Sequence, residues 1–135
     1  SPTDGRTLML NREELIALVE DAYFSNVDNK NPEPAVACFA EDAELRIQSA
    51  HVSHVGHDQI GRMFQDFMAA TKVIYHGDFS HVVDVENQWI ASQFVARNDY
   101  DDGRHVEMRN CNFFQIENDR FKRVTIYMTD ENPLV

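Results

Sequence analysis

The sequence predicts an α+β domain in which three helices pack on one face of a mainly antiparallel sheet. Two observations lead to this prediction. Apolar residues recur every three to four positions through the first half of the chain, and every two positions through most of the second half. Short polar turns such as Asp101-Asp102-Gly103 separate the alternating runs, as they do in hairpins. A run of helices followed by a run of strands is typical of an α+β domain.

The helical half has recognisable ends. The first helix is expected to begin after Asn11, a good N-cap residue, with Glu14 at the capping-box position. The Asn-Lys-Asn-Pro run at 29–32 ends it, because the residue before a proline disfavours helical angles. A short helix at 33–40, a strand at 42–47 and a third helix beginning at 56–58 are expected to follow.

The second half should form four long antiparallel strands, at about 75–86, 88–100, 104–117 and 120–129. The third of these has a more apolar face that should point at the helices, and this face nevertheless holds Asn110 and Asn112. Burying an amide without partners costs roughly 1–3 kcal/mol. The two amides therefore either bond to each other and to nearby backbone, or contact a ligand. Val106, Met108, Phe114 and Ile116 complete this face.

The composition limits the classes of partner. The chain has 135 residues and a formal net charge of −11, which disfavours nucleic acid and anionic membrane surfaces. No apolar stretch approaches the ~20 residues of a membrane span, and no signal opens the sequence, so a cytoplasmic location is expected. Cys38 and Cys111 are expected to be buried free thiols in a reducing compartment. We expect residues 1–10 to form a loose tail and residues 11–135 to form one domain.

The histidines do not indicate a metal site. His51 and His54 are three residues apart and would point to opposite faces of a strand, and His57 begins a helix. His81 follows His76 by five residues, so it is expected on the opposite face of the strand. The sequence contains no nucleotide, flavin or metal motif, and no cofactor is expected.

Several residues lie between these elements in a familiar order, namely Tyr23, Asp28, the run 39–43, Val55-Gly-His-Asp58, Tyr75-His76, Phe121 and the run 127–130. In this order the chain resembles the nuclear transport factor 2-like superfamily, in particular its SnoaL-like branch, over residues ~11–130. The resemblance implies a cone-shaped α+β fold. In such a fold a strongly curved sheet wraps around the helices and encloses a cavity, and members frequently form homodimers through the sheet.

One group within the superfamily provides a site by resemblance. Scytalone dehydratase, hexachlorocyclohexane dehydrochlorinase and bile-acid 7α-dehydratase share an aspartate that ends the first helix and a histidine that opens the first meander strand. The matching residues here are Asp28 and His76, and Tyr23 matches a tyrosine of the bile-acid enzyme. Asn112 matches an asparagine that lines the scytalone dehydratase site, and Asp99 lies near a second acidic position of the bile-acid enzyme. The arginine that some of these enzymes use near the C-terminus has no clear counterpart.

Two other mechanisms of the superfamily fit poorly. Ketosteroid isomerases need a carboxylate base at the position of Ile47, which cannot accept a proton. Limonene epoxide hydrolases need an Arg-x-Asp motif, which Arg97-Asn98-Asp99 matches. They also need an aspartate at the position of Ile126 and a Tyr-x-Asn pair at the positions of Leu45 and Ile47, so half of the water-activating set is missing.

The resemblance implies an enzyme that works by general acid–base catalysis. His76 would remove a proton, Asp28 would orient the imidazole, and Tyr23 would donate a hydrogen bond to developing negative charge. We expect a cofactor-independent lyase, dehydratase or isomerase that acts on a small hydrophobic, even polycyclic, metabolite. A non-catalytic binding or dimerisation domain and a polyketide cyclase are the alternatives. The residues expected to bind the substrate are Asn112, Asn110, Asp99, Arg97, Phe114 and Met108.

Overall fold

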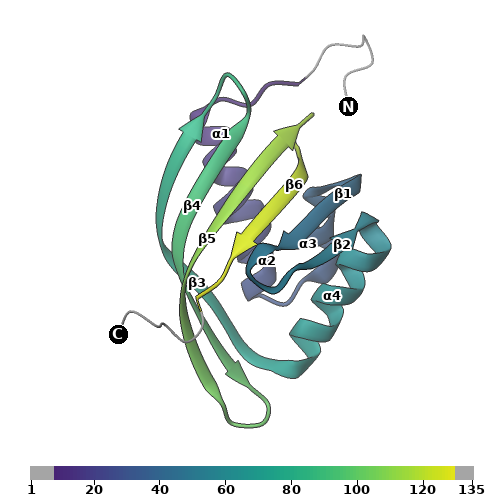
Figure 1. Ribbon diagram of the computed structural model, residues 1–135, viewed down its shortest axis with the longest axis vertical. Helices are drawn as coiled ribbons and strands as arrows, with labels where there is room; N and C mark the ends of the chain where they lie inside the picture. Colours follow the sequence, from purple (N-terminus) through teal and green to yellow (C-terminus); the bar gives the residue numbers. More distant parts are fainter. Residues whose placement is uncertain (1–7, 130–135) are drawn as a thin grey trace.

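The structure is a computed structural model that describes residues 8–129. Its helices lie on one face of a six-stranded sheet, so the α+β class predicted from the sequence is confirmed. Figure 1 shows the long strands β3, β4 and β5 running the length of the molecule and curving strongly. The first helical segment lies behind these strands, and α4 lies beside the short strands β1 and β2.

The first helical segment is continuous but changes its winding. It comprises α1 (Arg12–Ala17), a π-helical segment η1 (Leu18–Phe24) and α2 (Ser25–Asp28). Asn11 caps it, and the predicted capping box with Glu14 is present. A π-helical segment inserts extra residues into the ladder of hydrogen bonds and often marks a functional site. The spacing of apolar residues predicts an uninterrupted α-helix here and gives no sign of this change in winding.

Two shorter helical segments and two short strands follow. They are α3 (Pro32–Ala37), β1 (Phe39–Ile47), the 3₁₀ turn η2 (Gln48–Ala50) and β2 (Val52–Val55). The strand β1 begins three residues earlier than predicted. The helix α4 (Gly56–Ala70) then buries Ile60, Phe64 and Met68 against the sheet.

Four long strands complete the sheet, and each lies close to its predicted position. They are β3 (Thr71–Asp84), β4 (Trp89–Tyr100), β5 (His105–Glu117) and β6 (Arg120–Tyr127). The strand order is β2-β1-β6-β5-β4-β3, and all neighbours are antiparallel except β1 and β6. The apolar face of β5 is buried as predicted, including Asn110 and Asn112, because its side chains alternate across the sheet.

A β-bulge interrupts β3 between Gly77 and Ser80. Gly77 pairs with Val95 and Ser80 pairs with Gln93, so the bulge adds one residue to β3. Asp78, inside the bulge, has a left-handed φ of 54°. The added residue changes which face the later side chains occupy.

Residues 1–7 of the predicted tail lie outside the described residues. The backbone N–H of Leu8 donates to Asn118 Oδ1, and Leu10 exchanges two hydrogen bonds with the side chain of Gln88. The chain therefore contacts the turns of the sheet from residue 8 onward.

Candidate functional site

Asp28 and His76 form a hydrogen-bonded pair where the first helical segment ends against β3. Oδ1 of Asp28 lies 2.5 Å from Nδ1 of His76, and the backbone N–H of His76 donates to Oδ2 of Asp28 at 3.0 Å. The two side chains are 23% and 11% exposed, respectively. An ionised carboxylate only accepts, so the imidazole must carry its proton on Nδ1. In the neutral ring, Nε2 is then free to accept a proton.

His76 lines a pocket of about 270 Å³ between the helices and the concave face of the sheet. The first helical segment contributes Tyr23, Phe24 and Val27, and α4 contributes Met63, Phe64 and Phe67. None of the described residues that line this pocket is Lys, Arg, Asp or Glu. The lining from the sheet and the segment that follows β6 consists of Leu45, Ile47, Phe94, Ala96, Asn98, Tyr100, Met108, Asn110, Asn112, Ile126 and Met128.

Tyr23 lies deeper in the same pocket and is 3% exposed. Five phenylalanine rings surround it, with centroids between 4.8 and 6.1 Å away. Burial raises the pKa of its hydroxyl well above the usual value, and the nearby Cys38 and Asp28 raise this pKa further. Tyr23 therefore remains a neutral phenol, which can donate a hydrogen bond to an oxygen in the pocket.

The predicted substrate-binding residues of β5 occupy different environments. Met108, Asn110 and Asn112 line the pocket. Asn110 Oδ1 accepts a hydrogen bond from the backbone N–H of Thr129 at 3.1 Å, whereas Asn112 Oδ1 is buried without a partner among the described residues. Phe114 is fully buried and packs on Phe121 with centroids 4.8 Å apart, so it supports the wall and does not line the pocket.

Arg97 and Asp99 are not part of the pocket, contrary to the sequence analysis. Both point to the outer face of the sheet, because Asn98 between them points inward. Arg97 is paired with Glu107 at 2.7 Å, and Asp99 is paired with His105 at 2.6 Å. Hydrogen bonds from Arg97 and then Arg109 lower the pKa of Glu107 to about 2. Arg97 and Asp99 therefore form surface ion pairs.

A second carboxylate–imidazole pair lies further along β3, and its histidine lies on the same face of the strand as His76, not on the opposite face as expected. His81 faces the helices, because the bulge after Gly77 shifts the alternation by one residue. Its Nε2 lies 2.5 Å from Glu20 Oε2, and its Nδ1 lies 2.7 Å from the hydroxyl oxygen of Ser92. Ser92 is fully buried, and neither it nor His81 lines the pocket.

Phe24 and Asn98 line the pocket but were not predicted as site residues. Phe24 packs against His76 with the two rings tilted and their centroids 4.6 Å apart, and Asn98 and Tyr100 add polar groups to the sheet side of the pocket. The alternation of buried Phe94, Ala96 and Asn98 along β4 was available as a signal in the sequence.

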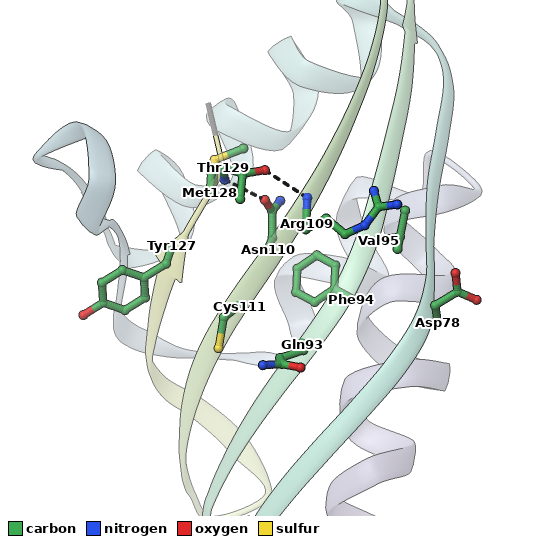
Figure 2. Close-up of a pocket in the computed structure, with 10 residues that line it drawn as sticks. All are labelled: Asp78, Gln93, Phe94, Val95, Arg109, Asn110, Cys111, Tyr127, Met128 and Thr129. Atoms are coloured by element: carbon green, nitrogen blue, oxygen red, sulfur yellow. Dashed lines mark hydrogen bonds between the residues drawn. The ribbon is translucent and has the colours of Figure 1, made fainter. Parts of the chain in front are cut away.

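A second hollow, of about 410 Å³, opens on the sheet, mainly on its outer side (Figure 2). It shares Phe94, Asn110 and Met128 with the first pocket and contains neither Asp28 nor His76. Figure 2 shows Thr129 beside β5, where its backbone N–H donates to Asn110 Oδ1 and its hydroxyl oxygen accepts from the backbone N–H of Arg109. The other lining residues are Asp78, Gln93, Val95, Cys111 and Tyr127.

Within residues 8–129, no helix is long and apolar enough to cross a membrane. In the same range, no group of three or more His, Cys, Asp or Glu side chains is arranged to hold a metal ion. His57, one of the three closely spaced histidines, instead lies 2.8 Å from the carbonyl oxygen of Phe39 through its Nε2.

The curved sheet, the helices on its concave face and the pocket between them define an α+β domain of the nuclear transport factor 2-like type. The family model described as the SnoaL-like domain matches residues 21–124. The chain therefore belongs to the SnoaL-like family. A comparison with curated proteins found no match.

Solved structures with the same fold have low sequence identity to this chain. A candidate polyketide cyclase from Xanthomonas campestris is 19% identical, with a TM-score of 0.77 over 87% of this chain and 92% of that one. The pinacolase BvnE from Penicillium brevicompactum is 16% identical, with a TM-score of 0.76 over 90% and 88%. A candidate isomerase from Bacillus subtilis is 12% identical, with a TM-score of 0.78 over 93% and 91%. These likenesses show the fold.

Proposed function

We propose that the protein is a cofactor-independent lyase or isomerase that removes a proton from a neutral, hydrophobic small molecule. The observation that carries this proposal is the Asp28–His76 pair at the wall of an otherwise largely apolar pocket. Neutral imidazole is a suitable general base near neutral pH. The carboxylate on Nδ1 fixes the tautomer that exposes Nε2 and stabilises the imidazolium once it forms.

The pocket also offers hydrogen-bond donors for an oxygen that gains negative charge. If Nε2 of His76 takes a proton from a carbon next to a carbonyl group, the electron pair moves onto the carbonyl oxygen. The hydroxyl of Tyr23 and the amide of Asn112 line the same pocket and can donate to that oxygen. Removing one such donor typically costs a factor of ~10²–10³ in rate.

The imidazolium can then complete either reaction. Returning the proton to a different carbon gives an isomerase. Donating it to a departing hydroxyl group, which leaves as water while the electron pair forms a double bond, gives a dehydratase. The pocket lining contains no Lys, Arg, Asp or Glu, and His76 is neutral when it acts as the base. An uncharged lining favours a neutral substrate over a carboxylate.

A polyketide cyclase is the second candidate. The same carbanion would attack a second carbonyl within one substrate, and His76 would return the proton to the new alkoxide. A protein of similar fold that is named as a candidate polyketide cyclase favours this alternative. The reaction begins with the same proton removal, so both candidates depend on His76.

Deuterium exchange tests the first step without knowledge of the natural substrate. We would incubate 2-tetralone, a neutral bicyclic ketone, in D₂O with the protein and follow loss of its α-protons by NMR. The wild type should accelerate exchange and His76→Ala should not. His105→Ala, which removes an exposed histidine paired with Asp99, is the matched control and should exchange like the wild type. Undiminished exchange in His76→Ala would exclude His76 as the base.

The deuterium-exchange assay also distinguishes an enzyme from a non-catalytic binding domain. Saturable binding of 2-tetralone by the wild type, with no acceleration of exchange, would favour a non-catalytic domain that uses the same pocket.

We also propose that a second copy of the chain covers the outer face of the sheet. Large apolar side chains are exposed there, and Phe113 and Tyr127 pack edge to face with centroids 6.1 Å apart. Exposed apolar patches on a sheet are typical of interfaces. The other members of this patch are Val73, Tyr75, Val82 and Trp89.

A further inference from the structure

Asn98 has an unpaired buried oxygen in a part of the pocket that neither the Asp28–His76 pair nor the resemblance explains. Its side chain is 4% exposed, and Oδ1 has no hydrogen-bond partner among the described residues. Nδ2 makes one long bond, at 3.4 Å, to the hydroxyl of Tyr100. A buried acceptor without a partner is destabilising, so a residue with only a structural role should be apolar here.

The neighbours of Asn98 strengthen this argument. It pairs with Ile74 on β3 and with Val106 on β5, so both cross-strand partners are apolar. The buried amide of Gln88 provides a contrast. Its Oε1 accepts from the backbone N–H of Leu10, and its Nε2 donates to two backbone carbonyl oxygens. The side chain of Gln88 therefore connects the N-terminal segment to a turn of the sheet, whereas Asn98 makes no comparable hydrogen bonds.

Asn98 is placed to contact a ligand that also reaches His76. His76 pairs with Ala96, so Asn98 is its diagonal neighbour on β4, about 7–8 Å away. Tyr100, two residues further along, lines the same pocket with its ring under the guanidinium of Arg104, 4.5 Å from the centroid. Because Nδ2 of Asn98 donates to the hydroxyl oxygen of Tyr100, the hydroxyl hydrogen of Tyr100 is free to donate.

We propose that Asn98 and Tyr100 form a subsite that binds a hydroxyl group of a neutral alcohol or phenol with a hydrophobic frame. The ligand hydroxyl donates to Oδ1 of Asn98 and accepts from the hydroxyl of Tyr100. The amide turns about χ2 to reach it and gives up only the long bond to Tyr100. A ketone or a carboxylate cannot donate, and a carboxylate finds no Lys or Arg in the pocket lining.

This inference rests on the proposed function only in taking the pocket as the ligand site. It does not require His76 to act as a base. The two proposals can therefore fail separately.

Three related probes test the subsite: 2-naphthol, naphthalene and 2-naphthoate, titrated against the protein by NMR. A hydrogen bond of ordinary strength should make the wild type bind 2-naphthol roughly tenfold more tightly than naphthalene. The 2-naphthoate should bind more weakly than 2-naphthol. Equal affinities for 2-naphthol and naphthalene, or tighter binding of 2-naphthoate, would overturn the proposal.

The variant Asn98→Leu should abolish the preference for 2-naphthol and raise the melting temperature of the ligand-free protein, because it removes the unpaired oxygen. Tyr100→Phe should reduce the preference without a large change in melting temperature. Gln88→Leu, the matched control with a fully bonded amide, should lower the melting temperature and keep the preference.

A structural role for Asn98 predicts the opposite pattern. If Asn98→Leu lowers the melting temperature as Gln88→Leu does and retains the preference for 2-naphthol, the subsite does not exist. His76→Ala should retain the preference whether or not it abolishes deuterium exchange. This comparison separates failure of the subsite from failure of the proposed reaction.

Discussion

Replacing Asp28 by Asn tests how the carboxylate controls His76. In the wild type, both oxygens of Asp28 accept hydrogen bonds from His76, one from Nδ1 at 2.5 Å and one from the backbone N–H at 3.0 Å. Asparagine has nearly the same shape and keeps one oxygen, which can accept from the backbone N–H. Its NH₂ group then faces Nδ1 and must donate to it. The neutral imidazole must therefore move its proton to Nε2.

The size of the effect follows from these two bonds. Hydrogen bonds to a charged group contribute roughly 1.5–3 kcal/mol each and neutral ones roughly 0.5–1.5 kcal/mol, so Asp28→Asn should lower the free energy of unfolding by about 2–3 kcal/mol. At ~3 °C per kcal/mol for a chain of this length, the melting temperature should decrease by roughly 6–9 °C. In the Ser-His-Asp proteases, the same exchange lowers the rate by about 10⁴ because the tautomer is wrong. We expect a comparable loss of deuterium exchange here.

Nitrogen-15 NMR of labelled histidine measures the tautomer directly, at a pH at which the imidazole is neutral. In the wild type, Nε2 of His76 should have the shift of an unprotonated nitrogen, and in Asp28→Asn the two nitrogens should exchange roles. Glu20→Gln is the matched control, because it changes the partner of His81 and should leave the signals of His76 unaltered. An Asp28→Asn variant in which His76 keeps its proton on Nδ1 would refute this reasoning.

Four further outcomes are expected. Tyr23→Phe should slow deuterium exchange ~10²-fold or more and change the melting temperature little, because no described residue bonds to the hydroxyl; unchanged exchange would exclude the donor role. Burial raises the pKa of Cys38 from 9.0 to about 11, so the folded state retains this proton longer than the unfolded chain. The contribution of Cys38 to the free energy of unfolding, measured by urea unfolding as the difference between the wild type and Cys38→Ala, should therefore be constant below pH 9 and decrease between pH 9 and 11 by up to ~1.4 kcal/mol per pH unit. Phe113→Lys should give a monomer in sedimentation velocity if a second copy covers the outer sheet face, while Lys122→Ala should not. His81→Phe should lower the melting temperature more than His105→Ala, whose ring is 76% exposed, and equal effects would argue against a tethering role.

The sequence predicted the fold because the relevant signals are local. The capping box at Asn11, the proline at 32 and the alternation of β5 each depend on a few neighbouring residues, and each has the expected consequence in the structure. The contact between Asp28 and His76 joins residues 48 positions apart. No local pattern encodes such a contact, and the resemblance to a known family suggested it.

The prediction that Arg97 and Asp99 line the pocket is wrong because it relied on a motif and not on the alternation of side chains along β4. The resemblance to an Arg-x-Asp motif and to a second acidic position of the bile-acid enzyme placed Arg97 and Asp99 in the pocket, although strand alternation allows either these two or Asn98 to point inward. The buried Phe94 and Ala96, at two-residue spacing before Asn98, favour Asn98. The error at His81 was different in kind. A bulge adds one residue without a clear sequence signature, and every later side chain then changes face.

The part of β3 that contains the bulge is about as long as the part of the first helical segment that it contacts. From Glu20 to Asp28 the helical segment advances eight residues, or at most about 12 Å, because Glu20–Phe24 belongs to the wider π-helical winding. From His76 to His81 the strand advances five residues, but one is taken up by the bulge, so the remaining four span about 13 Å. Both carboxylates can therefore bond to a histidine of β3 in the same structure, and Phe24 packs against Phe79 with the two rings tilted and their centroids 5.3 Å apart. In a regular strand, His81 would point away from Glu20, and the helix would be held on β3 at one end only. The geometry of the Asp28–His76 pair therefore depends on a tether and a bulge that lie outside the pocket.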